Sequence, residues 1–514
     1  METLQSKPAS NTAWILLAFI AAKFILQFTL INPDYDLHRD EYLHLDQGDH
    51  LAWGYLSVPP LTSWLSWFIK LLGSSVFAVK FFPALFGALT LLVVWKTIEE
   101  LRGSLYTLVL GAVCVLLSVL VRINFLYQPN SADILCWTAI YYFLIKYINT
   151  QRPKWLLWGG VVFALGFLNK YNVAFLALGL LPALLITSQR KMLAKKDIYL
   201  AAVLAFILIL PNLIWQYANN FPVIHHMKEL TDTQLVHVSR WLFLKEQLIF
   251  FFSALPVILA ALYALLSYKP FAQYRVFFWI FAFTLGAFLF FRAKGYYAIG
   301  LYPVYIAFGS VFLGNVLNVG FKKYLKPVFV LVPVAFYVMA FNIGFSIESP
   351  QEIINHKDTY MKIGLLRWED GKNHELPQDM ADMLGWKELA AKVDAAISQL
   401  PQGHTLVLCD NYGQAGAINY YSADKNIGAV SFNADYINWF ELDKPVYNVI
   451  RVKELQNEKD ELEKTGPFFE KGFVSDSVAN PLAREYGTTI FAFSRPKFDI
   501  NDRLKAEIVE EKWD

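Results

Sequence analysis

The stretch DYDLHRDEYLHLDQGDHLAWGYLSVPPLTSW, residues 34–64, lies between two apolar runs that are each long enough to cross a membrane. It gathers six carboxylates and three histidines in a place where the connection between two helices is ordinarily short. An acidic loop of this kind between membrane helices is the expected chemical centre of the chain. The apolar runs on either side of it predict the fold.

The composition indicates a polytopic membrane protein. Of 514 residues, 56% are hydrophobic and only 17% are charged, and the mean hydropathy is +0.37. A soluble enzyme of this size would be less apolar. The formal net charge of +2 gives no indication of nucleic-acid binding.

Apolar runs of about 20 residues, the length that crosses a hydrocarbon core, recur along the first two thirds of the chain. About eleven such runs predict an α-helical membrane protein. They lie near residues 13–31, 76–95, 105–121, 132–148, 155–169, 171–187, 198–215, 241–266, 276–291, 297–317 and 327–345. The two runs around Leu156 and Val173 are short, which suits a tilted or re-entrant segment.

The distribution of lysine and arginine predicts the orientation. If the N-terminus is cytoplasmic, the inside loops include the basic clusters 190–196 and 322–326, as the positive-inside rule requires. The first run lacks a convincing cleavage site and is expected to be a retained helix. We therefore expect a multi-pass protein of the inner (plasma) membrane, with the acidic loop and everything after about Phe345 on the extracytoplasmic side.

The apolar character stops near Ser346, and the periodicity then changes. Helical spacing in 385–400 and 453–464 alternates with short strand patterns in 404–410, 445–452 and 488–493. Alternating helices and strands predict a small extracytoplasmic α/β domain. The expected domains are a membrane domain, 1–345, with its first outer loop, 32–75; a connector, 346–384; and a soluble α/β domain, 385–514.

Five segments carry a family resemblance. Asp40-Glu41 followed by GYLSVPPLTSW resembles bacterial members of the dolichyl-phosphate-mannose protein mannosyltransferase superfamily, which includes the lipid A aminoarabinose transferase. Four further similar segments follow in order, PNSADILCW (129–137), LGFLNKYNVAF (165–175), LPNLIWQ (210–216) and AKGYYAIGLYPV (293–304). The resemblance covers residues 10 to about 345. It implies a GT-C fold and transfer of a sugar from a polyprenyl-phosphate carrier on the outer side of the membrane.

Transfer from a sugar phosphate needs a general base near the acceptor and positive charge near the phosphate. Asp40 matches the family's first-loop catalytic aspartate and is the expected base. Glu41 would position Asp40, bind the acceptor or help to hold a cation, and the alternative for the pair is a solvated acidic loop. Asp133 would assist the base or bind an acceptor hydroxyl, but it could equally stabilise a helix N-terminus. The other four loop carboxylates are expected to serve loop structure or acceptor contacts.

Basic residues on the outer side oppose the positive-inside trend, so each needs a reason to be there. The resemblance implies that Lys170 and Lys294 bind the donor phosphate, and Arg39 and Arg240 are further candidates. The alternative is a cation at a helix end that reaches to the interface.

Aromatic and histidine side chains complete the expected site. The tyrosines Tyr55, Tyr171, Tyr296 and Tyr297 are expected to line the substrate, although tyrosine is also common in interfacial belts. His225 and His226, with the first-loop carboxylates, form a conceivable divalent-cation set of no recognised spacing. No cofactor is required with certainty.

Two features bear on specificity. Relatives that act on lipid A often carry a lysine or a Glu-Lys pair before the two prolines, whereas this chain has Ser57-Val58. In the outer domain, DNYGQAGAINYY (410–421) predicts a strand-to-helix turn that either presents backbone N–H groups to a ligand or only begins a helix. We expect this domain to cap the active site or to help select the acceptor.

The sequence thus predicts an inverting glycosyltransferase that moves a hexose or pentose from a polyprenyl-phosphate donor to a hydroxyl on the outer face of the membrane. The acceptor would be a lipid, a glycan or a protein, and the other partners are membrane lipids, not nucleic acid. The alternative is a transporter or flippase of lipid-linked saccharides, which would place ionisable groups at the bilayer midplane.

Overall fold

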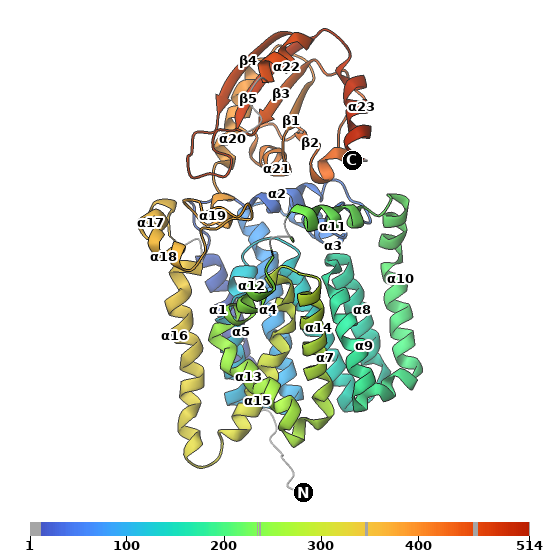
Figure 1. Ribbon diagram of the computed structural model, residues 1–514, viewed down its shortest axis with the longest axis vertical. Helices are drawn as coiled ribbons and strands as arrows, with labels where there is room; N and C mark the ends of the chain where they lie inside the picture. The colour runs from blue at the N-terminus through green and yellow to red at the C-terminus, as the bar shows by residue number, and fades with distance from the viewer. Residues whose placement is uncertain (1–11, 234, 236–237, 345–347, 456–460, 513–514) are drawn as a thin grey trace. The chain divides into compact units, whose positions relative to one another are not determined.

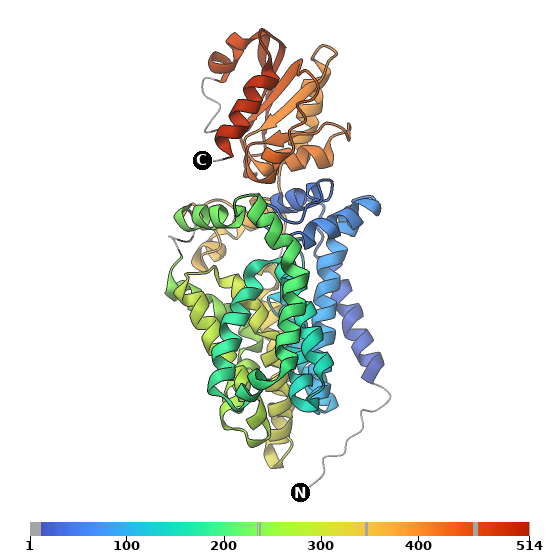
Figure 2. The ribbon, with the colours of Figure 1, turned by 90° about the vertical axis from the view of Figure 1, so that its right-hand side faces the viewer.

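The computed structural model describes residues 12–512 except 234, 236–237, 345–347 and 456–460, and these divide into two compact units (Figures 1 and 2). One unit is built from the described residues of Met1–Ile31, Val58–Leu61 and Phe77–Phe345. The other is built from those of Asn32–Ser57, Thr62–Val76 and Ser346–Asp514. Most of the first loop, which the sequence groups with the membrane domain, therefore packs in one unit with the C-terminal residues.

The first unit is helical. Its α-helices are α1 (Thr12–Thr29), α4 (Val76–Glu100), α5 (Leu105–Leu116), α6 (Leu120–Ile123), α7 (Asn130–Thr150), α8 (Pro153–Asn169), α9 (Ala174–Ile186), α10 (Lys196–Ala218), α11 (Pro222–Thr233), α12 (Arg240–Phe250), α13 (Leu255–Ser267), α14 (Arg275–Phe290), α15 (Pro303–Val316) and α16 (Lys326–Gly344). Short 3-10 segments connect several of them, including η1 (Tyr171–Val173) and η6 (Gly295–Leu301).

Helices lie over all eleven predicted apolar ranges, which confirms a polytopic helical protein. Within the described residues, four helical spans are long and apolar enough to cross a membrane, and up to seven are if each of three sharply bent pairs is one span. One bent pair, Tyr171–Ile186 with Ser188–Ala194, turns by 107° close to the range expected to be tilted or re-entrant. The count of eleven crossings stays a prediction.

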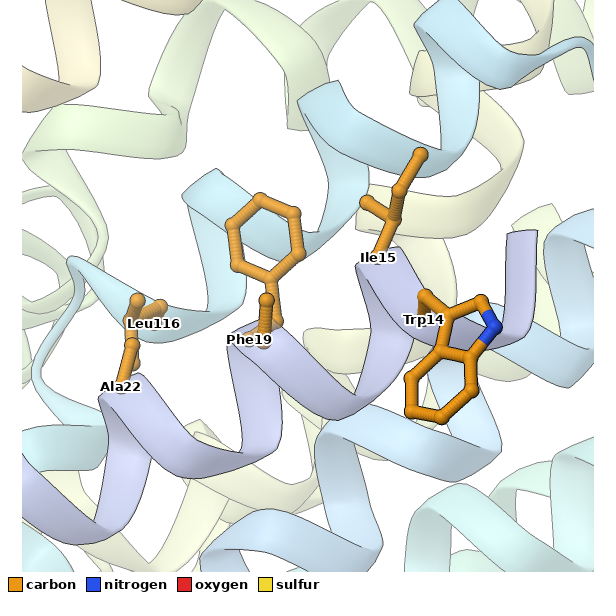
Figure 3. A pocket seen from close by; sticks show the side chains of 6 residues that line it. Trp14, Ile15, Phe19, Ala22 and Leu116 are labelled. Atoms are coloured by element: carbon orange, nitrogen blue, oxygen red, sulfur yellow. The ribbon is translucent and has the colours of Figure 1, made fainter. Parts of the chain in front are cut away.

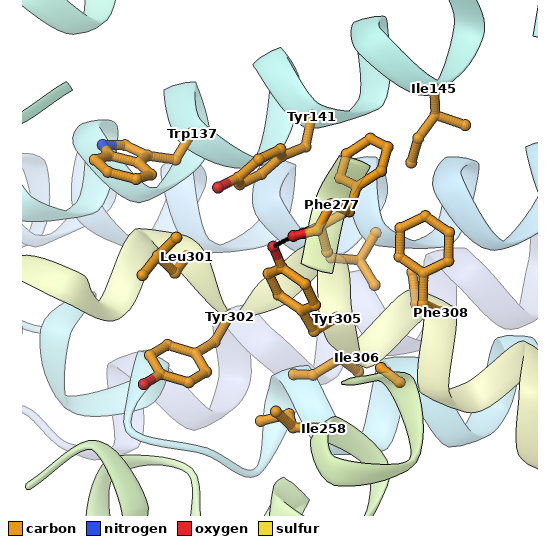
Figure 4. Close-up of a cluster of buried hydrophobic side chains, with 14 of the residues drawn as sticks. Trp137, Tyr141, Ile145, Ile258, Phe277, Leu301, Tyr302, Tyr305, Ile306 and Phe308 are labelled. Carbon is orange, nitrogen blue, oxygen red and sulfur yellow. Dashed lines mark hydrogen bonds between the residues drawn. The ribbon is translucent and has the colours of Figure 1, made fainter. Parts of the chain in front are cut away.

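The helical unit is held together by large aromatic side chains and small residues. Trp137, Tyr141, Phe277 and Tyr305 interdigitate in its core, and the Tyr305 hydroxyl donates a 2.7 Å hydrogen bond to the Phe277 carbonyl (Figure 4). Gly309 lets α15 approach α13, because a Cβ there would lie 1.9 Å from the carbonyl oxygen of Val257. Without a hydrophobic driving force between helices in lipid, such close packing supplies the association energy.

The second unit contains a five-stranded mixed sheet. Its helices are α2 (Arg39–Asp46), α3 (Leu61–Leu71), α17 (Pro350–Asn355), α18 (Lys357–Lys362), α19 (Gln378–Ala381), α20 (Trp386–Ser398), α21 (Tyr412–Tyr421), α22 (Glu461–Thr465) and α23 (Ile500–Glu511). Its strands are β1 (Thr405–Cys409), β2 (Val430–Ser431), β3 (Asn448–Lys453), β4 (Phe469–Ser477) and β5 (Thr489–Pro496). The strand order is β2-β1-β3-β5-β4, with β1 parallel to β2 and β3 and with β5 antiparallel to β3 and β4.

The predicted α/β character of this unit is confirmed, with differences in detail. Strand β1 is central, so its Leu406–Cys409 segment is buried throughout. Helix α20 buries apolar residues at helical spacing. The sequence missed β2, which is very short, and β4, whose exposed and buried residues do not form an apolar run. Of the helix predicted over 453–464, Lys453 belongs to β3, Glu461–Thr465 is helical and 456–460 lie outside the described residues.

Helix α2 of the first loop packs directly on α21 of the C-terminal region, and two glycines make this approach close. A Cβ on Gly416 would lie 2.5 Å from the Tyr436 hydroxyl and 2.7 Å from Cβ of Tyr42. A Cβ on Gly413 would lie 3.3 Å from Cβ of Arg39. The predicted strand-to-helix turn is present, α21 begins at Tyr412, and the two glycines serve as a packing surface for the first loop.

Hydrogen bonds to buried carboxylates also join the first loop to the C-terminal region. Asp46 Oδ2 accepts hydrogen bonds of 2.8 Å from both the Asn419 amide and the Tyr436 hydroxyl. Asp435, from the C-terminal region, accepts from the Gln47 amide at 2.8 Å and from the Leu56 N–H at 2.7 Å. These bonds cross between segments almost 400 residues apart in sequence, so they are invisible to any local pattern.

Asp36 supplies a further link between the loop and the C-terminal region. Its carboxylate accepts from the backbone N–H groups of Trp386 and Lys387 at 3.0 and 3.2 Å. It thereby caps the first turn of α20, where a negative charge is favourable. The loop carboxylates other than Asp40 and Glu41 thus include two, Asp36 and Asp46, that hold structure.

We predict that Gly416→Ala destabilises the second unit by about 1–3 kcal/mol, because the added methyl group overpacks the contact between α21 and α2. Thermal unfolding of the purified full-length protein measures the effect. Gly466→Ala is the matched control, since no atom lies within 4 Å of a Cβ built at that position. Equal midpoints for the two variants would contradict the close packing of α2 on α21.

We predict that the buried carboxylate of Asp46 makes the free energy of unfolding depend on pH. Burial raises its pKa to about 6, against the opposing effects of Lys70 and of the hydrogen bonds from Asn419 and Tyr436. The folded state then binds more protons than the unfolded state between about pH 4 and 6, so the free energy of unfolding falls as the pH rises through this window.

Asp46→Asn keeps an oxygen for Tyr436 and Asn419 but cannot ionise. We expect the variant to unfold at the same or a higher temperature than the wild type at pH 7, with a gain of up to about 3 kcal/mol, and to lose part of the pH dependence between pH 4 and 6. Asp49→Asn, at a more exposed carboxylate of the same loop, is the control. Clear destabilisation of Asp46→Asn at pH 7 would refute the assigned cost of the buried charge.

Candidate functional site

The first group of chemically capable side chains surrounds Asp40 in the second unit. Asp40 occupies the first turn of α2, and His38 caps that helix by accepting the Asp40 N–H at Nδ1, 3.2 Å away. The Asp40 Oδ1 atom accepts a 2.7 Å hydrogen bond from the Tyr412 hydroxyl. The Asp40 side chain remains 35% exposed, so an external molecule can reach the carboxylate.

Several charges act on the Asp40 carboxylate. Partial burial works to raise its pKa, but His38, Arg39, the Tyr412 hydrogen bond and His44 together outweigh burial and hold the pKa below its usual value. His38 Nδ1 lies 3.8 Å from Asp40 Oδ2, and His38 Nε2 lies 3.7 Å from the buried Asp382. Asp40 is therefore ionised at neutral pH, the state in which a carboxylate accepts a proton or attracts a cation.

Glu41 and Tyr55 form hydrogen bonds within the first loop. Glu41 is fully buried, and its Oε2 accepts the His38 N–H at 2.8 Å, which completes a capping box at the start of α2. Glu41 therefore helps to position Asp40, one of the roles expected for it. The Tyr55 hydroxyl donates to the carbonyls of Gln47 and His50 at 3.1 and 2.9 Å and is buried. Substrate lining by Tyr55 stays a prediction.

The second group lies in the helical unit, where three of the resembling segments meet. Lys170, directly after α8, donates a 2.7 Å hydrogen bond to the Asn130 side chain at the start of α7. Its ammonium lies 4.3 Å from the ring centroid of Tyr297 and 5.0 Å from that of Tyr296. Cation–π contacts of this kind hold a lysine without neutralising its charge.

Asp133 belongs to the same group. It is 4% exposed, and its two oxygens accept from the Trp137 indole at 3.0 Å and from the Asn172 amide at 2.9 Å. The Asn172 amide also donates to the Tyr297 carbonyl at 2.8 Å, and thereby ties η1 to η6. Asp133 sits in the first turn of α7, a position that suits the expected charge at a helix N-terminus. Assistance to the base or binding of an acceptor hydroxyl by Asp133 stays a prediction.

The remaining sequence-predicted residues are placed as follows. The Tyr171 hydroxyl of η1 accepts from the Gln216 amide at 2.8 Å and donates to Asn212 at 3.2 Å, both on α10. Lys294 immediately precedes η6, and its charge acts on Lys170. Arg240 begins α12 and donates from Nε to the Leu289 carbonyl at 3.2 Å.

The two candidate metal-binding histidines lie on α11. His226 Nδ1 is 3.9 Å from Oε2 of Glu229, one turn further along the helix. Among the described residues, no group of three or more His, Cys, Asp or Glu side chains could hold a metal ion. The divalent-cation hypothesis thus stays a prediction without a ligand set in the described part of the chain.

A buried lysine that sequence reasoning missed lies within the first membrane-length helix. Lys23 is 2% exposed, and its ammonium donates to Gln27 Oε1 at 2.7 Å, Asn124 Oδ1 at 2.9 Å and the Leu120 carbonyl at 3.4 Å. All three of its donors are used by neutral oxygens. Lys23 therefore joins α1 to the segment after α5, and the signal for it was a charged residue inside an apolar run.

Tyr412 and Asn172 are the other residues that sequence reasoning did not single out. Both lie inside segments that had been noted, DNYGQAG and LNKYN, but their partners are hundreds or tens of residues away. The one pocket drawn in close-up is lined by apolar residues of α1, Trp14 to Ala22, and by Leu116 (Figure 3). Such a lining suits hydrocarbon and contributes no catalytic group.

Comparison with known proteins gives two sequence matches. The family model described as dolichyl-phosphate-mannose-protein mannosyltransferase matches residues 57–215, which include Asp133 and Lys170. The lipid A galacturonosyltransferase RgtD of Rhizobium johnstonii is 27% identical over 217 residues. This alignment covers 40% of the present chain and 45% of the relative, so the chain is matched over less than half of that relative's length.

Solved structures give a match over nearly the whole fold. ArnT from Cupriavidus metallidurans bound to undecaprenyl phosphate superposes with a TM-score of 0.59 at 13% identity, covering 94% of this chain and 98% of that one. The apo form of the same protein gives 0.58 at 14% identity. At this identity the likeness concerns the fold alone. The chain is a polytopic helical protein with the fold of ArnT, and residues 57–215 are similar to the dolichyl-phosphate-mannose-protein mannosyltransferase family.

Proposed function

We propose that the protein is an inverting glycosyltransferase that moves a sugar from a polyprenyl-phosphate donor to an acceptor hydroxyl on the extracytoplasmic face of the membrane. The observation that carries the proposal is the state of Asp40, an ionised and partly exposed carboxylate fixed at the start of a helix by the Tyr412 hydroxyl. The ArnT structure with undecaprenyl phosphate and the match to a lipid A galacturonosyltransferase support a lipid-linked donor and a lipid or glycan acceptor.

In this reaction Asp40 takes the proton of the acceptor hydroxyl while the hydroxyl oxygen attacks the anomeric carbon. The new glycosidic C–O bond forms as the bond between the anomeric carbon and the phosphate oxygen breaks, and the polyprenyl phosphate leaves with the bonding electrons. Attack opposite the leaving group inverts the anomeric configuration. A base with a depressed pKa is a modest proton acceptor, so positive charge at the leaving phosphate must supply much of the acceleration.

Lys170 and Lys294 supply that charge in the proposal. In the described part of the chain Lys170 contacts a neutral amide and two aromatic faces, and the Asp133 carboxylate accepts hydrogen bonds from Trp137 and Asn172. Asp133 then orients Asn172 and Lys170 and does not itself touch the phosphate. Arg39 and Arg240 stay further candidates, and the apolar surfaces of the membrane helices would hold the polyprenyl tail.

The sugar, hexose or pentose, and the acceptor are to be found by experiment. Mass spectrometry of surface glycolipids, glycans and glycoproteins from cells with and without the gene identifies the missing product. Reconstitution of the purified protein with the implicated donor then tests transfer directly. A transporter or flippase, the alternative, would move the lipid-linked saccharide across vesicles without forming a new glycosidic bond, so product formation in detergent separates the two functions.

Asp40→Asn tests the base. We expect the turnover number to fall by a factor of about 10²–10⁴ with the fold intact, because Asn retains an oxygen for the Tyr412 hydroxyl but cannot accept a proton. Asp34→Asn, an exposed carboxylate of the same loop, is the control and should retain wild-type activity. Near-normal turnover of purified Asp40→Asn would remove Asp40 from this role.

Lys170→Gln tests the phosphate contact. We expect the KM for the polyprenyl-phosphate sugar to rise by roughly tenfold or more, with a smaller effect on the acceptor KM, because a charge-assisted contact to the phosphate is lost. Lys96→Gln, at a lysine of α4 paired with Glu99, is the control. An equal effect on both substrates would show that Lys170 only supports the fold.

A further inference from the structure

Tyr412, the first residue of α21, touches two residues of the first loop with different parts of its side chain. Its hydroxyl donates to Asp40 Oδ1 at 2.7 Å, and its ring lies under the Arg39 guanidinium at 4.4 Å from Cζ to the ring centroid. All three residues belong to the second compact unit. We propose that Tyr412 is a positioning residue through which the C-terminal domain fixes the base Asp40 and the cation Arg39; this inference rests on the proposed function.

Tyr412 is itself held in place. The preceding residue, Asn411, caps α21 by accepting the Gln414 N–H at 3.0 Å, and its amide donates to Glu454 at 2.7 Å and to Glu485 at 3.1 Å. The Gln414 amide donates to Glu485 at 2.6 Å. A capped helix start that is tied to Glu454 and Glu485 by three hydrogen bonds cannot easily shift, so the direction of the Tyr412 hydroxyl is determined by the C-terminal domain.

Arg39 contacts the ring of Tyr412, whereas Asp40 contacts its hydroxyl. Gly413 leaves room for the Arg39 stem, and the guanidinium rests on the Tyr412 ring. The Arg39 Nε–H is buried and has no hydrogen-bond acceptor among the residues that the structure describes. A buried donor without a partner is costly, and guanidinium groups pair well with phosphate or carboxylate oxygens. The Tyr412 ring therefore holds the Arg39 guanidinium next to the base.

The charges around Asp40 predict what happens when the hydroxyl is removed. From its own helix and cap Asp40 faces His38, Arg39 and His44, and from α21 it faces Tyr412. Asp382, which follows α19, faces His38 at 3.7 Å and is itself paired with Arg484 at 3.1 Å. The Tyr412 hydrogen bond is one of the interactions that hold the pKa of Asp40 down, so its loss moves that pKa upward while the charged neighbours stay.

The two contacts can be separated by substitution. Tyr412→Phe keeps the ring under Arg39 and removes only the hydroxyl, whereas Tyr412→Leu removes both. Tyr436→Phe is the matched control, because the Tyr436 hydroxyl makes an equivalent 2.8 Å bond to a different carboxylate, Asp46. All variants are made in the full-length protein and assayed with the polyprenyl-phosphate sugar that supports wild-type transfer.

We expect the acidic limb of kcat/KM to move to higher pH by about half a unit to one unit in Tyr412→Phe, with the donor KM close to that of the wild type. In Tyr412→Leu the donor KM should also rise several-fold, because the Arg39 guanidinium loses its contact with the aromatic ring. Tyr436→Phe should unfold at a lower temperature but keep the wild-type acidic limb. In the Asp40→Asn background, Tyr412→Phe should change the residual rate less than twofold, because it acts through Asp40.

Other outcomes separate a failure of the Tyr412 inference from a failure of the proposed function. If the wild type transfers sugar and Tyr412→Phe has the wild-type pH profile, Tyr412 is structural and this inference fails while the proposed function stands. If Tyr412→Phe and Tyr436→Phe shift the limb equally, the shift reports general loosening and the inference also fails. If the wild type transfers no sugar from any polyprenyl-phosphate donor and gene deletion leaves surface glycans unchanged, the proposed function fails and takes the inference with it.

Discussion

The contact between helix α2 of the first loop and helix α21 of the C-terminal domain is the constraint on which the candidate chemistry depends. Asp40 lies on a helix of only eight residues, Arg39–Asp46, and a helix of that length is not stable alone in water. Its stability comes from burial against α21, from the capping box of His38 and Glu41, and from the buried bonds of Asp46. The position of the carboxylate is thus a property of the second unit as a whole.

This constraint has an electrostatic consequence. The loop carries many carboxylates, and mutual repulsion would leave them mobile if all were solvated. Instead, Asp36 is used at the start of α20, Asp46 is buried against Tyr436 and Asn419, and Glu41 is used at the start of α2. Among these acidic residues, Asp40 combines an exposed fraction of about one third with positive neighbours that favour its ionised form. The structural use of Asp36, Glu41 and Asp46 sets Asp40 apart from these three carboxylates.

The helical unit also contains charged side chains that differ in their partners. A charge inside an apolar protein must be paired or hydrogen-bonded. Lys23 has three neutral acceptors and holds helices together, whereas Lys170 has one amide acceptor and two aromatic faces beside it. The two lysines look alike in the sequence, as single charges within or beside an apolar run. The two lysines differ in the number and kind of their partners, which only the tertiary structure shows.

The sequence by itself determined the polytopic helical fold, the change to an α/β domain near residue 385, and the segments that contain Asp40, Asp133 and Lys170, because hydrophobic periodicity and short motifs are local properties of a chain. Only the tertiary structure decided that the first loop packs with the C-terminal domain, that Gly413 and Gly416 serve that packing, and that Tyr412 joins Asp40 to Arg39. These contacts join residues more than 370 positions apart, and no spacing along the chain encodes which distant surfaces fit each other; shape, burial and paired charge in three dimensions do.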